Sequence, residues 1–340
     1  MMNQVLSADA AMARAIECAR LGLGKTFPNP IVGAVITSAT GEFISEGFHQ
    51  GGDHAEVVAI NAAKDIPAGS IIYVTLEPCN HLGKTPPCTE AIVSAGLSKV
   101  VYAVSDPNPV AAGGAERLRE AGIEVVAGLG EIEARHENRA WLTKIELGRP
   151  RITWKIASTM DGKVAASDGS SKWITGELAR ADVALMRSQF DAIVTSTATV
   201  KEDDPLLTSK GLGKNPVRIV MGSSEIPVDS KILNQDAETL VIKSREAKDL
   251  ISLANDRGFN QLMIESGPTF GTSLLSDELI DEIVLYQAPT FLGSGTSAIG
   301  DLGISNISGR LDFEITDVEI IGADLKITLI RSAKPIEGGR

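Results

Sequence analysis

The N-terminal half of the chain alternates short apolar runs with segments of helical spacing. Runs rich in isoleucine, valine and tyrosine, bounded by glycine, proline or serine, are typical of strands. Apolar residues three and four positions apart are typical of helices. A longer helical segment is expected over 131–147. The other expected elements are strands at 31–37, 41–47, 70–76 and 99–105, and helices at 54–64 and 88–96.

The same alternation starts again after a break at Gly148 and Pro150, which supply a helix stop and a chain break. A hairpin across 313–331 is expected to close this second series. The pattern therefore predicts an α/β protein with two domains, 1–147 and 151–334, and a short polar tail at 335–340. The expected strands of the second domain are 151–159, 191–196, 216–221, 239–243, 261–265 and 282–288.

Charge and cysteine content limit the classes of function that the protein can have. The chain has 340 residues and a formal net charge of -12. Because nucleic-acid binding depends on neutralising phosphates with Lys and Arg, a nucleic-acid partner is not expected. No apolar run approaches the roughly 18 residues of a membrane span, and the N-terminus lacks a signal-peptide pattern. We therefore expect a cytoplasmic enzyme without a membrane partner. Three cysteines cannot form a disulfide framework, so metal binding or catalysis is the expected use, and only Cys79 and Cys88 are placed for it.

One spacing pattern carries metal chemistry. His54 and Glu56 open a predicted helix, and Cys79 and Cys88 follow a predicted strand, giving H-x-E…P-C-x₈-C. One imidazole and two thiolates give zinc three ligands and leave the fourth tetrahedral position for water, as in catalytic zinc sites. Cys18 lies within a helical apolar pattern and is expected to be a buried core thiol.

Glu56 is the predicted proton shuttle. Zinc lowers the pKa of its bound water to about 7, and Glu56 can move protons from that water to a departing amine without binding the metal. Simpler interpretations exist, because a histidine at a helix start can be a cap and a glutamate in a first turn can serve the helix dipole. A structural zinc site would need a fourth ligand from Cys18 or His81.

The quoted motifs resemble a known family. "NPIVGAVI", "HAEVVAI", "VTLEPCNHLGKTPPC" and "SDPNPVAAGG" are similar to the deaminase half of the bifunctional riboflavin-biosynthesis deaminase/reductase family of the RibD type. The long cysteine spacing is the most specific part. The resemblance implies a cytidine-deaminase-like domain acting on a diaminopyrimidinone joined to ribose 5-phosphate. The residues that it implies for this substrate are His81, Lys84 and Thr85 at the phosphate, and Asn29, His49, Asp106 and Asn108 around the base and ribose.

Several of these assignments have a structural alternative. In an acidic protein, a phosphorylated substrate needs a local cation, and Lys84 in the inserted loop can supply it. Replacing Lys84 with alanine is therefore expected to weaken substrate binding and leave the zinc content unchanged. For Asn29, Asp106 and Asn108, the alternative is turn chemistry beside proline.

The second half lacks the G-x-G-x-x-G fingerprint, but "IESGPTFGTSLL" places a glycine turn before a helix, a pattern that can bind anions. With "KIASTMDGKVA", "SSKWIT" and "APTFLGSG" it resembles the family's reductase half, which implies a dihydrofolate-reductase-like fold that uses NADPH. The resemblance covers roughly residues 5–330. The implied NADPH residues are Ala157, Trp173, Thr199, Asp203, Ser223, Gly267, Pro268, Thr269, Phe270, Gly271, Thr272 and Ser273. The implied substrate residues are Lys155, Ser171, Arg187, Leu207, Lys210 and Glu265.

Some residues of this set depart from the family or have simpler roles. Lys210 stands where the family leads us to expect arginine, and its loop is short. Trp173 and Leu207 could be ordinary packing residues, and Asp203 a turn residue. Lys155 and Asp203 are the candidate proton donors. Arg187 and Lys210 are expected to pair with the substrate's 5-phosphate.

The sequence thus predicts a bifunctional zinc deaminase and NADPH reductase acting on a phosphorylated pyrimidine, and the resemblance implies a homodimer or tetramer. Two alternatives stay open. One is a zinc nucleoside or tRNA deaminase with an accessory domain, and the other is a non-catalytic regulator that binds zinc and nucleotides. A folate-type reductase with a decayed deaminase half is disfavoured, because the deaminase motif is intact.

Overall fold

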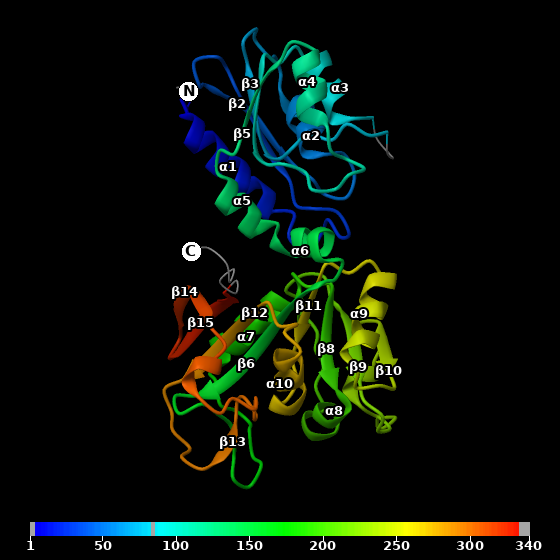
Figure 1. The fold of residues 1–340 in the computed structure, drawn as a ribbon, viewed down its shortest axis with the longest axis vertical. Coiled ribbons are helices and arrows are strands. Elements are labelled where there is room, and N and C mark those ends of the chain that lie inside the picture. The colour runs from blue at the N-terminus through cyan, green and yellow to red at the C-terminus, as the bar shows by residue number, and fades with distance from the viewer. Residues whose placement is uncertain (1–3, 83–85, 333–340) are drawn as a thin grey trace. The chain divides into compact units, whose positions relative to one another are not determined.

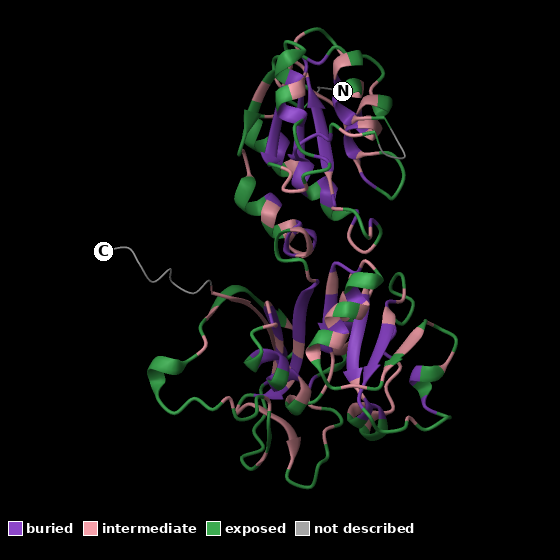
Figure 2. Cartoon of the chain, turned by 45° about the vertical axis from the view of Figure 1, so that its right-hand side comes forward, coloured by how far each residue is buried: buried purple, intermediate pink, exposed green. Residues whose placement is uncertain are grey.

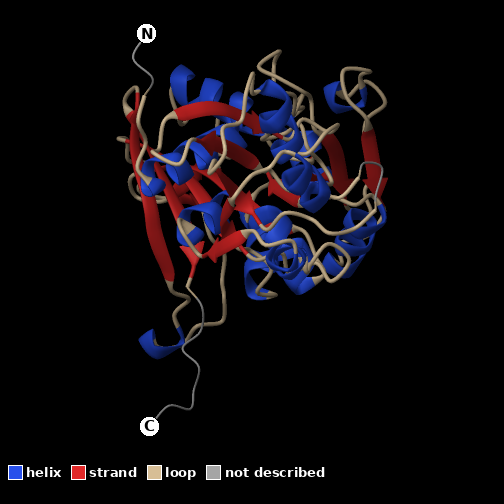
Figure 3. Cartoon of the chain, turned by 90° about the horizontal axis from the view of Figure 1, so that it is seen from above, coloured by secondary structure: helices blue, strands red, loops and turns tan. Residues whose placement is uncertain are grey.

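A sheet with helices packed against it organises each half of the chain. The computed structural model describes residues 4–82 and 86–332, and the chain divides into an N-terminal unit, Met1–Arg149, and a C-terminal unit, Pro150–Arg340. Both units are built from helices and strands (Figure 3), which confirms the predicted α/β class. None of the helices within the described residues is both long and apolar enough to cross a bilayer.

Strands β2, β3 and β5 belong to the sheet of the N-terminal unit (Figure 1), whose full strand order is β2-β1-β3-β4-β5. Strand β1 pairs antiparallel with both β2 and β3, whereas β3, β4 and β5 run parallel. The central strands are buried on both faces (Figure 2), as expected for parallel strands covered by helices. The strands are β1 (Gly33–Thr37), β2 (Phe43–Phe48), β3 (Ile71–Leu76), β4 (Lys99–Val104) and β5 (Glu124–Ala127).

Two apolar cores flank this sheet and make it the middle of three layers. One core joins Met12 and Ile16 of α1 and Trp141 of α6 to the sheet, and the other joins Ile92 of α3 and Leu118 of α4 to the opposite face. Helix α2 packs on that second face. The helices are α1 (Ala8–Arg20), α2 (Ala55–Ala62), α3 (Cys88–Ser94), α4 (Gly114–Glu120), α5 (Glu131–Glu137) and α6 (Arg139–Leu147).

The single helix predicted over 131–147 is wrong, because the segment forms two helices that break at Asn138. The side chain of Asn138 is 3% exposed and accepts a hydrogen bond from the Ile31 N–H at 2.9 Å. Its amide donates to the Ile31 carbonyl at 2.7 Å. Asn138 therefore joins this segment to the start of β1, and a tertiary contact overrides the helical pattern.

The C-terminal unit contains a larger sheet with the order β10-β9-β8-β11-β6-β12-β15-β14. The six strands from β10 to β12 are parallel, and β15 and β14 form the predicted antiparallel hairpin, which is confirmed. A separate pair joins β7 to β13. The strands are β6 (Arg151–Thr159), β7 (Lys163–Ala166), β8 (Ala192–Ser196), β9 (Val217–Met221), β10 (Thr239–Ile242), β11 (Gln261–Ile264), β12 (Glu282–Ala288), β13 (Gly295–Ser297), β14 (Phe313–Ile321) and β15 (Asp324–Arg331).

Helices pack against this second sheet. Val183 of α7 packs with Val284 and Tyr286 of β12. Gly271 of α10 lies against the indole of Trp154 in β6, where a Cβ would stand 2.1 Å from ring atoms. Only glycine fits this approach, so α10 is held close to the sheet. The helices are α7 (Glu177–Arg187), α8 (Thr197–Asp203), α9 (Ala247–Asp256) and α10 (Pro268–Ser276), with 3₁₀ turns η1 (Lys231–Leu233) and η2 (Ile307–Gly309).

Candidate active sites

Three ligand-type side chains converge in the N-terminal unit. His54 precedes α2, Cys79 follows β3, and Cys88 begins α3. The His54 Nδ1 lies 3.1 Å from the Cys88 Sγ and 3.5 Å from the Cys79 Sγ, and the three ligand atoms lie within 4.8 Å of one another. The His54 side chain makes no capping hydrogen bond to α2, so the helix-cap interpretation is not supported.

The donor set fits zinc. Hydrogen bonds from Cys88 and then His54 outweigh burial and lower the pKa of the Cys79 thiol to about 4, so its thiolate form is favoured. Within residues 4–82 and 86–332, the group around His54 includes neither Cys18 nor His81. Cys18 is buried, as predicted, and its thiol donates to the Gly47 carbonyl at 3.4 Å. The fourth-ligand alternative therefore finds no support, and one tetrahedral position stays open for water.

Glu56 lies in the first turn of α2, beside this cluster. Its side chain is 3% exposed, and burial raises the pKa of its carboxyl above the ordinary value. A carboxyl group with a raised pKa accepts and releases protons more readily near neutral pH, as a proton shuttle requires. This environment differs from the solvent-exposed one of a glutamate that only serves a helix dipole.

His49 is buried against His54, with the ring centroids 5.5 Å apart. Its Nδ1 lies 3.0 Å from the Asp53 carbonyl, and its Nε2 lies 3.2 Å from the Asn29 side-chain amide. Both ring nitrogens are thus occupied when His49 is neutral, and burial lowers its pKa in agreement with that state. This geometry favours His49 as the residue that orients the exposed Asn29.

The side chains of Asp106 and Asn108 form hydrogen bonds to the backbone within turns. The Asp106 carboxylate accepts from the Asn108 N–H at 2.8 Å, and Asn108 accepts from the Val110 N–H at 3.2 Å. This is the turn chemistry that the sequence offered as the alternative. His81 has a buried Nδ1 with no hydrogen-bond partner among the described residues. The other two residues expected at the substrate phosphate, Lys84 and Thr85, lie outside the described residues.

In the C-terminal unit, the cofactor candidates gather where parallel strands end. Strands β9, β8 and β11 are neighbours, so the segments that follow them meet at one edge of the sheet, the usual place for a nucleotide. The Thr199 hydroxyl lies 3.0 Å from that of Ser196 and 3.1 Å from that of Ser266. It also accepts from the Gly267 N–H at 3.3 Å. These hydroxyl and amide groups fit a phosphate-bearing cofactor at the start of α10.

Members of the 267–273 run have different environments. Gly267 has open space where a Cβ would stand, and α10 has no side-chain cap. Gly271 packs on Trp154, and the Thr272 hydroxyl accepts from the Gly300 N–H at 2.8 Å, so both make contacts within the unit. Of the rest, Pro268 and Phe270 are partly buried, and Thr269 and Ser273 are exposed.

The substrate candidates of this unit centre on Glu265. Arg187 donates from Nε at 2.5 Å and from Nη2 at 2.9 Å to the two Glu265 oxygens, and from Nη1 to the Thr208 carbonyl at 3.1 Å. The Lys155 Nζ lies 3.8 Å from Glu265. Burial opposes the charge of Glu265, but Arg187 and Lys155 outweigh it and lower its pKa. For Lys155 burial prevails and lowers the pKa.

The remaining candidates are less closely grouped. Leu207 is buried in an apolar cluster with Ile193 and Met263, as in the packing alternative. Trp173 is 71% exposed, with the Arg180 guanidinium 4.7 Å from the centre of its ring. The Asp203 carboxylate lies 3.7 Å from the Lys172 Nζ. Ser171 and Ala157 are partly exposed, and Ser223 and Lys210 are exposed.

Sequence reasoning missed Ser196 and Ser266, which complete the hydroxyl cluster with Thr199. It also missed Glu77, a buried carboxylate two residues before Cys79. The available signal for the serines was their position at strand ends, because Ser196 is the last residue of one predicted strand and Ser266 directly follows another. No local pattern marked Glu77, because its partners lie far along the chain.

Two family models match this chain, one in each of the two units. Residues 6–104 match the model of the cytidine and deoxycytidylate deaminase zinc-binding region, and residues 150–327 match the RibD C-terminal domain. The N-terminal unit is therefore a zinc-binding, cytidine-deaminase-like domain. The C-terminal unit is a dihydrofolate-reductase-like domain that uses NADPH.

Full-length relatives agree. The riboflavin biosynthesis protein RibD of Mycobacterium tuberculosis (strain H37Rv) is 43% identical, covering 97% of this chain and 99% of that protein. The Escherichia coli (strain K12) RibD is 37% identical, covering 94% and 98%. A diaminohydroxyphosphoribosylaminopyrimidine deaminase/5-amino-6-(5-phosphoribosylamino)uracil reductase from Thermotoga maritima has a TM-score of 0.87 at 33% identity, covering 95% and 98%. The chain therefore belongs to the RibD family of riboflavin biosynthesis proteins.

Proposed function

We propose that this protein catalyses two consecutive steps of riboflavin biosynthesis. The first removes an amine from 2,5-diamino-6-(5-phosphoribosylamino)pyrimidin-4-one as ammonia, and the second reduces the ribosyl group of the product to a ribityl chain. The observation that carries the proposal is the convergence of His54, Cys79 and Cys88 beside the buried Glu56. When bound, zinc supplies an activated water to the first step, and NADPH supplies a hydride to the second.

In the deaminase site, His54, Cys79 and Cys88 would hold the zinc. Glu56 moves the two protons of the attacking water in turn, one to the ring nitrogen and one to the leaving amine, so that ammonia departs and the oxygen stays on the ring carbon as a carbonyl. Its burial keeps bulk water from competing for these protons. Asn29, oriented by His49, faces the pyrimidine, and Asp106 and Asn108 line the ribose side. His81, Lys84 and Thr85 are proposed to contact the phosphate.

In the reductase site, the hydroxyls around Thr199 and the amides at the start of α10 hold the cofactor phosphates. Lys155 is the better candidate for the proton donor, because burial lowers its pKa and makes release of its proton easier. Asp203 is paired with Lys172. Because Glu265 already occupies the Arg187 fork, Lys210 is the more available cation for the substrate phosphate.

The test is a paired assay on purified, zinc-loaded protein with the diaminopyrimidinone ribosyl phosphate. Ammonia release and NADPH oxidation are recorded together, with and without NADPH. We expect ammonia release that does not depend on NADPH, and oxidation only after deamination. Ammonia without oxidation would mean that the second activity is misassigned. Deamination of tRNA would favour a tRNA deaminase with an accessory domain, and the absence of both signals would favour a regulatory zinc- and nucleotide-binding protein.

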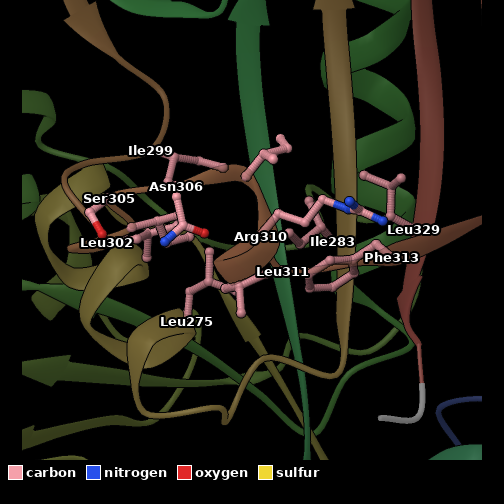
Figure 4. A pocket seen from close by; sticks show the side chains of 12 residues that line it. Leu275, Ile283, Ile299, Leu302, Ser305, Asn306, Arg310, Leu311, Phe313 and Leu329 are labelled. Carbon is pink, nitrogen blue, oxygen red and sulfur yellow. The ribbon is translucent and has the colours of Figure 1, made fainter. Parts of the chain in front are cut away.

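We also propose that two copies associate through β14. This nine-residue strand has β15 on one side and no partner strand on the other within the described residues. Its Ile315, Val318 and Ile320 are 63%, 54% and 77% exposed. An exposed apolar edge strand is a ready pairing surface, and a twofold axis would pair it with itself. Beside it, a largely apolar cavity of about 450 Å³ lies under the 299–313 segment (Figure 4).

Light scattering tests this association. Replacing Ile320 with lysine is expected to convert the protein to a monomer, because the charge would be buried without a partner. Replacing Ile132, which is 82% exposed in the N-terminal unit, is the matched control and is expected to leave the mass unchanged. A monomeric wild-type protein would contradict the proposal.

We further propose a cytoplasmic location, because all three cysteines are free thiols.

A further inference from the structure

Glu77 is a buried carboxylate to which the proposed mechanism gives no role. It lies between the end of β3 and Cys79, and only 8% of it is exposed. One carboxylate oxygen accepts from the Ala115 N–H at 2.9 Å, and the other accepts from the Asp106 N–H at 3.3 Å. Its own N–H donates to the Val104 carbonyl at 2.8 Å. Its carboxylate partners are backbone amides from two segments that lie about thirty and forty residues away in the sequence.

The contact with α4 is reinforced by a second one. Gly114, the first residue of α4, approaches the Pro78 carbonyl so closely that a Cβ there would stand 1.8 Å from the oxygen. Glu77 and Pro78 thus meet the first two residues of α4. Because these contacts are so close, they fix the start of α4 against the chain that leads into Cys79.

The contact with Asp106 reaches the proposed substrate side. Asp106 and Asn108 form the turn described above, and the segment then continues to Ala111. Ala111 packs against both Cys79 and Cys88, and its carbonyl accepts from the Asn80 N–H at 3.2 Å. The Asp106–Asn108 turn is therefore held at both ends by the chain around the zinc ligands, and Glu77 is the side chain that holds its beginning.

We propose that Glu77 is a positioning residue for deamination, which holds the Asp106–Asn108 turn in register with the zinc site. A buried carboxylate needs every hydrogen bond that it can form, and a buried amide left without an acceptor is costly, so this arrangement resists displacement. The proposal rests on the proposed function, because it assigns the turn to the substrate's ribose side. It predicts that loss of Glu77 weakens substrate binding more than it slows the chemical step.

The experiment replaces Glu77 with glutamine in the full-length chain. Glutamine keeps the size and one acceptor oxygen, but its NH₂ group faces one of the two amides and cannot accept from it. We expect the KM for deamination to rise about 10-fold, with kcat changed less than about threefold, for one lost hydrogen bond. Zinc content and the reductase rate with pre-formed deaminated substrate are expected to stay at the wild-type values.

Glu90→Gln is the matched control. Glu90 also contacts α4, through an exposed pair with Arg117 at 3.0 Å, so its loss removes a carboxylate without touching the turn. A double-mutant cycle with Asn108→Ala adds a second readout. If Glu77 acts through the turn, the increase in KM of the double variant is smaller than the product of the increases in Glu77→Gln and Asn108→Ala.

Three results would overturn the inference. They are an unchanged KM in Glu77→Gln, a loss of zinc at constant KM, and KM effects that multiply independently of Asn108. A parallel fall in the reductase rate would point to general unfolding and would likewise count against positioning. If the wild-type protein itself releases no ammonia, the proposed function fails, which is a different outcome from normal deamination that is indifferent to Glu77.

Discussion

The two proposed active sites hold their charged groups in different ways. In the N-terminal unit, His54, Cys79 and Cys88 lie close together, because the ends of α2, β3 and α3 bring them there. In the C-terminal unit, Glu265 is already neutralised by Arg187 and Lys155. The first arrangement has the donor set of a zinc site, whereas in the second the side chains of the chain neutralise one another. The metal site can thus be recognised from its residue types, whereas the charge pairing at the candidate reductase substrate site cannot.

The largest effect is expected from replacing Glu56, which tests the deaminase site separately from the reductase site. Glu56→Gln keeps the shape of the side chain but cannot shuttle protons, so kcat for deamination is expected to fall by about 10²–10⁴-fold. Zinc content, and NADPH oxidation measured with pre-formed deaminated substrate, should stay unchanged, because the ligands and the second unit are untouched. Parallel measurements of ammonia release, bound zinc and NADPH oxidation check this. Retained deamination would revive the interpretation of a non-catalytic zinc module.

The next largest effect is expected at Glu265, whose charge is neutralised by Arg187 and Lys155. Glu265→Gln leaves two partly buried cations without their partner and is expected to cost about 3–5 kcal/mol in the stability of the C-terminal unit. Reductase activity should be lost while deamination persists. Thermal unfolding followed with both activities checks the prediction, and equal loss of both would mean that the units do not unfold independently.

The same residue predicts a pH dependence. The pKa of Glu265 is lowered in the folded protein, so its contribution to stability is fully present above the ordinary value of 4.5. That contribution is lost as the pH falls below 4.5 through the lowered pKa. The Glu265→Gln variant should therefore lose less stability between neutral pH and strongly acidic pH than the wild type. An unchanged acid profile in the variant would contradict the assignment.

A smaller effect tests the packing behind the cofactor site. Gly271→Ala would place a Cβ 2.1 Å from the Trp154 ring, and this overpacking is expected to cost about 1–3 kcal/mol. The displaced α10 should raise the KM for NADPH. Denaturant unfolding and NADPH titration check both points. Gly267→Ala, where a Cβ has open space, is the matched control for stability.

The smallest effect is expected at Lys210. Because Lys210 is exposed, Lys210→Ala should raise the reductase KM for the phosphorylated substrate by only about 3–10-fold, and more at low salt than at high salt. Lys210→Arg should keep or improve binding of the phosphorylated substrate, because arginine can make a bidentate contact with a phosphate. The exposed Lys214 in the same loop supplies the control. An equal effect of Lys214→Ala would show general charge attraction rather than a specific contact.

The fold was largely predictable from periodicity. The predicted strands of both units are present, and most bounds shift by one to three residues. The 131–147 helix failed because Asn138 bonds to Ile31, 107 positions away, and no local pattern records that contact. Gly271 was assigned to the cofactor from its motif, although it packs on Trp154. A glycine in a motif does not reveal which neighbour requires the missing side chain.

By itself, the sequence determined the two-domain α/β class and the residues that can bind zinc, because ligand chemistry and hydrophobic periodicity are properties of the residues. Only the tertiary structure decided how Arg187, Lys155 and Glu265 share their charges, why Leu207 is core, and what Glu77 holds. These outcomes depend on distances between segments far apart in the chain. Electrostatic pairing and close packing act over a few ångströms of space, and sequence separation does not specify that distance.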